Sequence, residues 1–117
     1  MNLSSLDFQQ ARIKQVLFKS RLRSVLYGVR DVDDTLLSAQ HNPFGEWIQT
    51  VMKPQYSHHP EVSEIERQFA QMLNTGQELL SQYRRGLIEE ARAGLTRIDA
   101  HADRIGAFLQ AMESREA

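Results

Sequence analysis

The residues with the clearest capacity for chemistry in this 117-residue chain are its four histidines. An imidazole can bind a transition metal or move a proton near neutral pH. A metal site on helices needs ligands on one face, three or four residues apart, with a further histidine or carboxylate nearby. His41, His58, His59 and His101 have no such residue four positions further on. We therefore expect solvated surface histidines, and a metal at the His58–His59 pair only if another chain or a distant side chain completes it.

His101 permits a second hypothesis. Histidine phosphotransfer domains are four-helix bundles of about this length, in which an exposed histidine is followed by a lysine and a glycine. The stretch AHADRIGAF resembles that arrangement, with Arg104 and Gly106 in the following positions and the glycine one place further along. A phosphotransfer protein that uses His101 is therefore the alternative function.

The other polar residues form no recognisable catalytic arrangement. The chain has no cysteine, which excludes disulfides, thiol catalysis and thiolate metal sites. No Ser–His–Asp arrangement or glycine-rich phosphate loop is evident. The acidic pairs Asp33–Asp34 and Glu89–Glu90 fit helix capping and solubility better than acid–base chemistry. We expect no enzymatic activity.

Composition narrows the possible partners. Fourteen Lys and Arg residues against fifteen Asp and Glu residues give a net charge of −1, which argues against nucleic acid and anionic lipid as partners. No apolar run approaches the roughly 18 residues that span a bilayer, and the first residues do not resemble a secretory signal. We expect a cytoplasmic protein with a single domain over residues 1–117.

Three long segments repeat apolar residues at the three-four spacing of a helix that packs on one side. The last contains Ile88, Ala91, Leu95, Ile98, Ala102, Ile105, Leu109 and Met112. The third contains Val62, Ile65, Phe69, Met72, Gly76, Leu79 and Tyr83, widened by Leu73 and Leu80. The first contains Phe8, Ala11, Gln15, Phe18, Leu22 and Val25, with Ile13, Val16 and Leu17 beside them. Pro60 predicts the start of the third segment, and Gly28 and Gly86 predict where the first and third segments end.

The second segment is shorter and broken. An aspartate at position 31, 33 or 34 is expected to cap a helix that runs to about Ala39. Pro43 and Gly45 interrupt this helix, which can resume from Glu46 to Met52, and residues 53–60 are expected to form a loop. Together the four segments predict an all-α fold, an antiparallel four-helix bundle with an interrupted second helix. The sustained three-four stripes also suit packing between two chains.

Two motifs point to a family. The connector NPFGEWI resembles the C-x-F-G-K-W-L signature of the chemoreceptor zinc-binding domain, a bacterial four-helix sensory module. The stretch QVLFKSRLRSVLYG is similar to that family's H-x-x-W-K-x-R-L…G helix, with Lys19, Arg21, Leu22 and Gly28 in register. The stretch GLIEEARAGL is similar to the family's join between its third and fourth helices. The resemblance covers nearly the whole chain.

The zinc ligands of the family are missing from this chain. The family binds zinc through a histidine of the first helix, a cysteine of the connector and two histidines of the third helix. The matching positions hold Gln15, Asn42, Phe69 and Leu73. Amides bind zinc poorly and hydrocarbon side chains do not bind it, and His41 beside Asn42 would lack partners on the third helix. The resemblance therefore implies a member without the metal, and we expect no cofactor.

Two local hypotheses follow from this mapping. The Gln15 amide is predicted to bond across to the Asn42 amide, because each can donate and accept. Phe44 and Trp47 are predicted to anchor the connector by plugging the end of the bundle, with Gly45 allowing the backbone to approach closely.

The resemblance also suggests a function. Members of the family are attached to chemoreceptors or to diguanylate cyclases, which act in chemotaxis and in cyclic di-GMP signalling, and their bundle often helps to form a homodimer. We expect a regulatory module of bacterial signal transduction. It would dock to a second copy through an apolar face of its first or fourth helix, or to a separate signalling protein. A purely structural dimerisation unit has the same sequence features.

Overall fold

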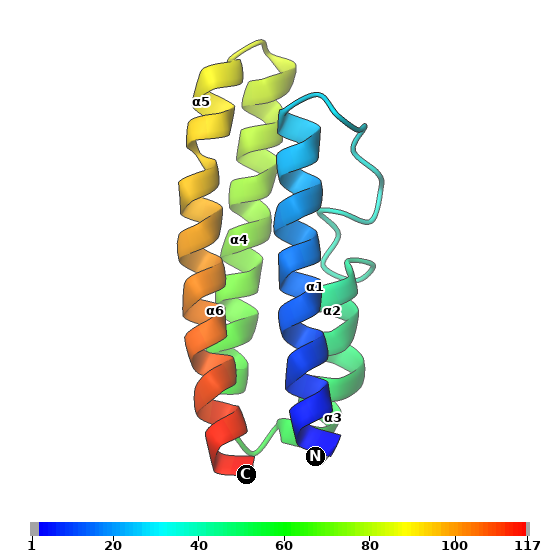
Figure 1. Cartoon of the computed structure of the whole chain (residues 1–117), viewed down its shortest axis with the longest axis vertical. Helices are drawn as coiled ribbons and strands as arrows, with labels where there is room; N and C mark the ends of the chain where they lie inside the picture. Colours follow the sequence, from blue (N-terminus) through cyan, green and yellow to red (C-terminus); the bar gives the residue numbers. More distant parts are fainter. Residues whose placement is uncertain (1–2, 117) are drawn as a thin grey trace.

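Long helical columns run side by side along the main axis of the computed structural model, which describes residues 3–116 (Figure 1). The first column is α1 (Leu3–Leu26). The second consists of α2 (Pro43–Trp47), the π-helical segment η1 (Ile48–Met52) and α3 (Lys53–Tyr56). The third is α4 (Glu61–Arg84), and the last consists of α5 (Ile88–Ala93) and α6 (Leu95–Glu116). Each column runs in the direction opposite to the one before it in the chain (Figure 1).

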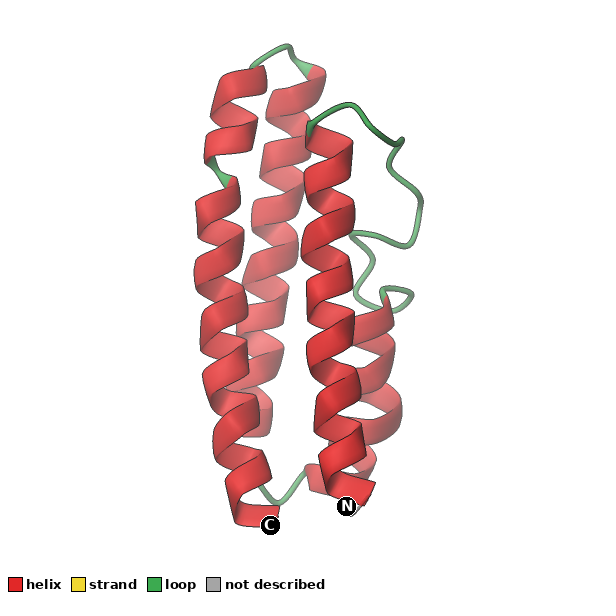
Figure 2. Cartoon of the chain, viewed as in Figure 1, coloured by secondary structure: helices red, strands yellow, loops and turns green. Residues whose placement is uncertain are grey.

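The described residues form helices and loops without strands (Figure 2), which confirms the predicted all-α class. The molecule measures 47 × 21 × 21 Å. Within the described part of the chain, no helix combines the length and the apolar character that crossing a membrane requires. Residues 1, 2 and 117 of the expected domain lie outside the described range.

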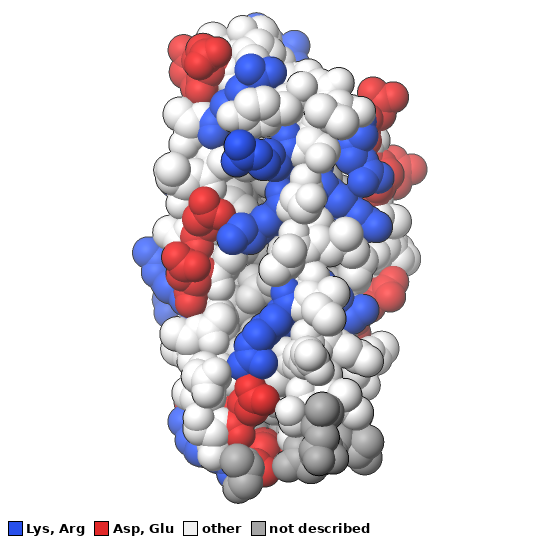
Figure 3. All heavy atoms as spheres, viewed as in Figure 1, with Lys and Arg blue, Asp and Glu red and all other residues white. Residues whose placement is uncertain are grey.

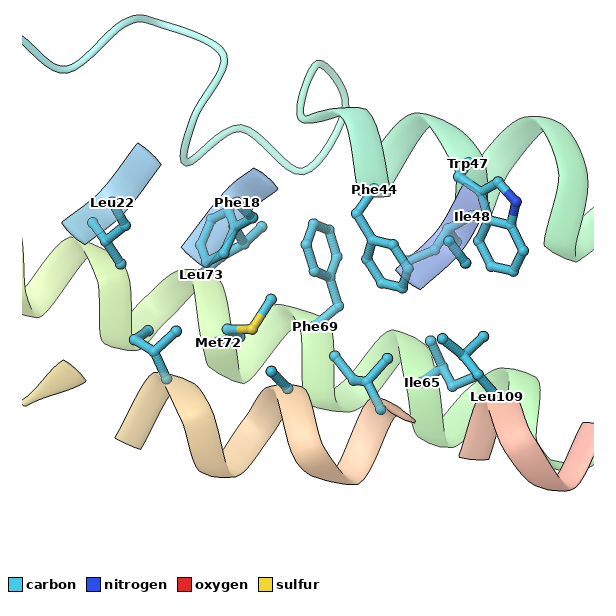
Figure 4. Close-up of a cluster of buried hydrophobic side chains, with 14 of the residues drawn as sticks. Phe18, Leu22, Phe44, Trp47, Ile48, Ile65, Phe69, Met72, Leu73 and Leu109 are labelled. Carbon is cyan, nitrogen blue, oxygen red and sulfur yellow. The ribbon is translucent and has the colours of Figure 1, made fainter. Parts of the chain in front are cut away.

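The apolar stripes read from the sequence form the core. All six stripe residues of α1 are buried, and so are the stripe residues of α4 except Tyr83, which is partly buried. On the last column Ile88 and Leu95 are half-buried, whereas the remaining stripe residues are buried. Phe18, Phe69, Leu73 and Met72 pack together in the middle of the molecule (Figure 4). The three-four spacing therefore predicted which side of each long helix faces inward.

The predicted helix ends are confirmed at two glycines. Gly28 follows α1 with a φ of +74°, and Gly86 follows α4 with a φ of +83°, a conformation that costs glycine least. A third glycine produces a break that the sequence analysis did not predict. A Cβ atom at Gly94 would lie 2.2 Å from Leu79 Cδ2, so the backbone approaches α4 here more closely than a side chain allows. The last column is divided at this glycine into α5 and α6.

The predicted helix that begins near Asp33 and runs to Ala39 is wrong, because residues 34–41 form turns. The capping signal itself is real: Asp33 Oδ1 accepts hydrogen bonds from the backbone N–H groups of Thr35 and Leu36, both at 2.9 Å. The helix does not continue, and the Leu36 carbonyl instead accepts a 2.7 Å hydrogen bond from the side-chain amide of Asn42. An Asx turn and a helix cap use the same local bonds.

The predicted interruption at Pro43 and Gly45 is also wrong, because the second column begins there. Asn42 is the N-cap residue and Pro43 occupies the first turn, where a missing N–H costs nothing. The predicted loop is too long, since residues 53–56 are still helical. Pro54 cannot donate to the Thr50 carbonyl, and the column widens into η1 just before it, with the Lys53 N–H bonding five residues back to Ile48.

Candidate functional site

The four positions that the resemblance would align with zinc ligands, Gln15, Asn42, Phe69 and Leu73, are all buried. Phe69 and Leu73, one turn apart on α4, line a hollow of about 200 Å³ together with Gly45. The Phe69 ring meets the Phe44 ring edge to face, with 5.3 Å between centroids. Leu73 and Phe18 of α1 belong to the same cluster of buried apolar side chains (Figure 4). The contacts of Phe69 described here are apolar, and its ring and the Leu73 side chain stand where the resemblance would place two imidazoles.

The predicted hydrogen bond between Gln15 and Asn42 is wrong. The Asn42 amide bonds elsewhere, because it donates to the Leu36 carbonyl and accepts from the Phe44 N–H at 2.9 Å. The Gln15 side chain is 6% exposed, yet its Oε1 has no hydrogen-bond partner within the described structure. Asn42 is therefore a satisfied cap, whereas Gln15 places an unpaired oxygen in an apolar seam.

The connector is anchored by its aromatic rings. Phe44 and Trp47 stack with 5.7 Å between centroids, and both side chains are buried. Trp47 also meets Phe8 of α1 edge to face at 6.2 Å. The close approach at Gly45 is real, but its nearest neighbour is the preceding loop: a Cβ atom there would lie 2.0 Å from the Ala39 carbonyl oxygen.

The isolated histidines differ in their surroundings. His41 is exposed in the turns before α2. The ring of His101 is partly buried, and its Nδ1 lies 2.9 Å from the Oε1 of the buried Gln68 on α4. Burial lowers the pKa of His101 from its ordinary value, and the charges of Arg104 and Arg97 add to this effect. One ring nitrogen of His101 therefore faces an amide instead of the solvent that a phosphoryl donor would arrive from.

The other two histidines meet a carboxylate at the end of the molecule where α6 ends. Nε2 of His59 lies 2.7 Å from Glu116 Oε2, and Nε2 of His58 lies 3.2 Å from the same oxygen. His59 is 5% exposed, so the expectation of a solvated surface histidine is wrong for it. The bond from His59 is the main reason why the pKa of Glu116 is lowered, and the bond from His58 contributes. Glu116 lies 57 residues from His59, so no local spacing could have revealed the cluster.

Arg115 extends this cluster to the start of α4. Its Nη1 donates to His59 Nδ1 at 3.0 Å and to Glu61 Oε1 at 2.6 Å, and its Nη2 bonds the other oxygen of Glu61. This two-pronged bond lowers the pKa of Glu61 to about 2. Both ring nitrogens of His59 therefore have a polar neighbour, which fixes the orientation of the ring.

A separate feature lies on the outside of α1. Leu6, Ile13, Val16 and Leu17 form what we call the outer face of α1. Ile13 lies seven residues after Leu6, and Val16 and Leu17 lie three and four residues after Ile13. The exposed fractions of the four residues are 42%, 60%, 66% and 36%. Val16 also borders a hollow of about 280 Å³ between α1 and α6. Lys and Arg side chains gather on the face of the molecule that α1 occupies (Figure 3). The sequence analysis placed three of these residues beside the buried stripe, and the structure shows them pointing away from the core.

Comparison of the chain with models of protein families, with curated proteins and with solved structures found no match.

Proposed function

We propose that this protein is a regulatory interaction module of bacterial signal transduction, built as a four-helix bundle that lacks the zinc site of its relatives. In this proposal it works by binding, not by catalysis, and pairs with a second copy to engage a chemoreceptor or a diguanylate cyclase-type protein. The observation that carries the proposal is the outer face of α1: four large apolar side chains at helical spacing stand in solvent on a helix whose opposite side is already buried. Contiguous exposed apolar surface of this kind is typical of an interaction site.

A second copy is the occupant that the outer face favours. A two-fold axis brings the same patch of both chains together. If two α1 helices cross antiparallel about position 15, Ile13 of one chain lies opposite Leu17 of the other. In this register Lys14 and Arg21 lie opposite Val16 and Gln9, so the basic side chains avoid one another. The arrangement buries the exposed apolar groups without placing like charges in contact.

The proposed loss of the zinc site is supported by separate observations. Phe69 and Leu73 fill with hydrocarbon the positions that match two ligands, and Asn42 is committed to capping α2. A core can survive the loss of an ion when apolar side chains of suitable volume replace it.

The solution mass of the protein tests the proposal. Sedimentation equilibrium over a concentration series should give twice the chain mass for the parent, and Ile13→Glu should give a single chain, because a carboxylate cannot be buried unpaired at the centre of the interface. Val29→Glu is the matched control: Val29 is 77% exposed but lies beyond the end of α1, so this variant should remain dimeric. A parent protein that stays monomeric, or an equal response of both variants, would overturn the pairing through α1.

A further inference from the structure

The cluster at the end of α6 has the composition of a metal site, and no other role has been assigned to it. His58 and His59 lie in the turn between α3 and α4, and Glu116 lies in the last turn of α6. One possible ligand atom from each residue lies within 4.8 Å of those of the other two. We propose that His58, His59 and Glu116 bind a divalent transition metal of the zinc class and thereby fasten the end of α6 to the start of α4.

The distances are close to those that an ion requires. Zinc holds nitrogen at about 2.0–2.1 Å and carboxylate oxygen at about 2.0–2.2 Å, which places neighbouring ligands of a tetrahedron roughly 3.3 Å apart. The two nitrogen–oxygen distances are 3.2 and 2.7 Å. An ion can therefore be accommodated if Glu116 withdraws by a fraction of an ångström, which a glutamate in a terminal helical turn can do.

The two histidines differ in restraint and exposure: His59 is held in one orientation, and His58 is open to solvent. His59 is held in place: its backbone N–H bonds the Tyr56 carbonyl at 3.0 Å, and its ring packs on the Tyr56 ring with 6.3 Å between centroids. The His58 side chain is 65% exposed, so an ion can enter from solvent and keep a water as a fourth ligand. The imidazole pair and the carboxylate are the nitrogen and oxygen ligands that zinc accepts.

Arg115 is expected to weaken metal binding. In the structure His59 Nδ1 lies 3.0 Å from Arg115 Nη1 and so accepts a hydrogen bond, which leaves the ring proton on Nε2, facing Glu116. A metal bound at Nε2 requires the proton to move to Nδ1, where Arg115 can no longer donate to it. Glu61, already joined to Arg115, is the carboxylate that could accept this proton in a hydrogen bond, as in other carboxylate–histidine–metal arrangements. Removing the guanidinium should therefore tighten binding.

Zinc titration of the untagged chain against a competing chromophoric chelator tests the inference, with Co²⁺ absorption reporting the coordination geometry. We expect one zinc per chain. His58→Gln and Glu116→Gln should each weaken binding at least tenfold. Both residues lie at the end of the molecule and outside the core, so these variants should still fold. Arg115→Gln should tighten binding several-fold, and the matched control His41→Gln, at an exposed histidine, should change nothing.

Three results would each overturn the inference: a parent that binds no zinc, equal affinity in the parent, His58→Gln and Glu116→Gln, or a loss of binding in His41→Gln. The inference does not rest on the proposed function, and different experimental results would contradict each of them. Zinc retained stoichiometrically by His58→Gln purified without chelator would place the ion elsewhere and would contradict the loss of the central site. A monomeric parent that binds zinc through His58 would contradict only the pairing through α1.

Discussion

The middle of the molecule and the end at which α6 finishes differ in whether their buried polar side chains have hydrogen-bond partners. In the core, Phe69 and Leu73 are buried, and the buried oxygen of Gln15 is left without a described partner. At the end, His59 is equally buried, yet both of its ring nitrogens face polar groups. Because an unpaired buried polar group costs more than a paired one gains, the end of the molecule can support ligand chemistry, whereas the middle is specialised for packing.

The largest expected effect is on the apolar middle. Phe69→Ala removes a buried ring that contacts Phe44 and should lower the free energy of unfolding by about 3–5 kcal/mol. Urea unfolding followed by the fluorescence of the buried Trp47 measures this change, and Phe69→Leu should cost much less because it keeps most of the volume. A loss below about 1 kcal/mol for Phe69→Ala would mean that this region is not packed as described.

A smaller effect of opposite sign is expected at Gln15. Gln15→Leu replaces an unpaired buried amide with hydrocarbon of similar size, and the free energy of unfolding should rise by about 1–2 kcal/mol. Gln10→Leu is the matched control, because Gln10 is exposed on the same helix and gains nothing from the change. Destabilisation by Gln15→Leu in the same urea experiment would show that the amide has a hydrogen-bond partner, such as a bound water.

The smallest effect concerns His101, a polar group between the two regions. Its folded-state pKa lies below the ordinary value of 6.5, so the unfolded chain takes up the proton first as the pH falls below that value. The free energy of unfolding should therefore fall between pH 7 and pH 5, and His101→Gln should reduce this fall. Circular dichroism during urea unfolding at both pH values gives the comparison between the parent and His101→Gln. An unchanged fall in His101→Gln would contradict the burial of the ring.

The parts of the structure that follow from periodicity could be predicted from the sequence. The spacing of residues such as Ile65 and Ile105 reports directly which side of a helix meets the core, and glycines at 28 and 86 mark chain reversals that other residues resist. Competing local signals could not be resolved in this way. The bonds of Asp33 suit a turn as well as a helix, and the contact that decides between them comes from Asn42, nine residues away.

The candidate sites were less accessible to sequence reasoning. The histidine pair was visible, but its completion by Glu116 depends on α6 being long enough to end beside the turn at residues 57–60. The spacing predicted the buried stripe of α1, including Phe18, but it gave no sign that the apolar residues beside the stripe stand in solvent. The exposure of Leu17 depends on where the neighbouring helices lie.

The π-helical segment η1 has a consequence for how this chain can vary. Trp47 and Tyr56 are nine residues apart, and a regular α-helix, at about 100° per residue, would point them to opposite sides. Both rings nevertheless meet Phe8, at 6.2 and 5.0 Å, because the wider turn absorbs part of that rotation. Removing one residue from 48–52 would leave the two rings eight residues apart, which a regular α-helix turns by only about 80°. The shortened segment could therefore form ordinary α-helix and keep Tyr56 near Phe8 and its bond with Asp7. The π-turn thus marks a place where this chain can lose one residue without turning its buried rings apart.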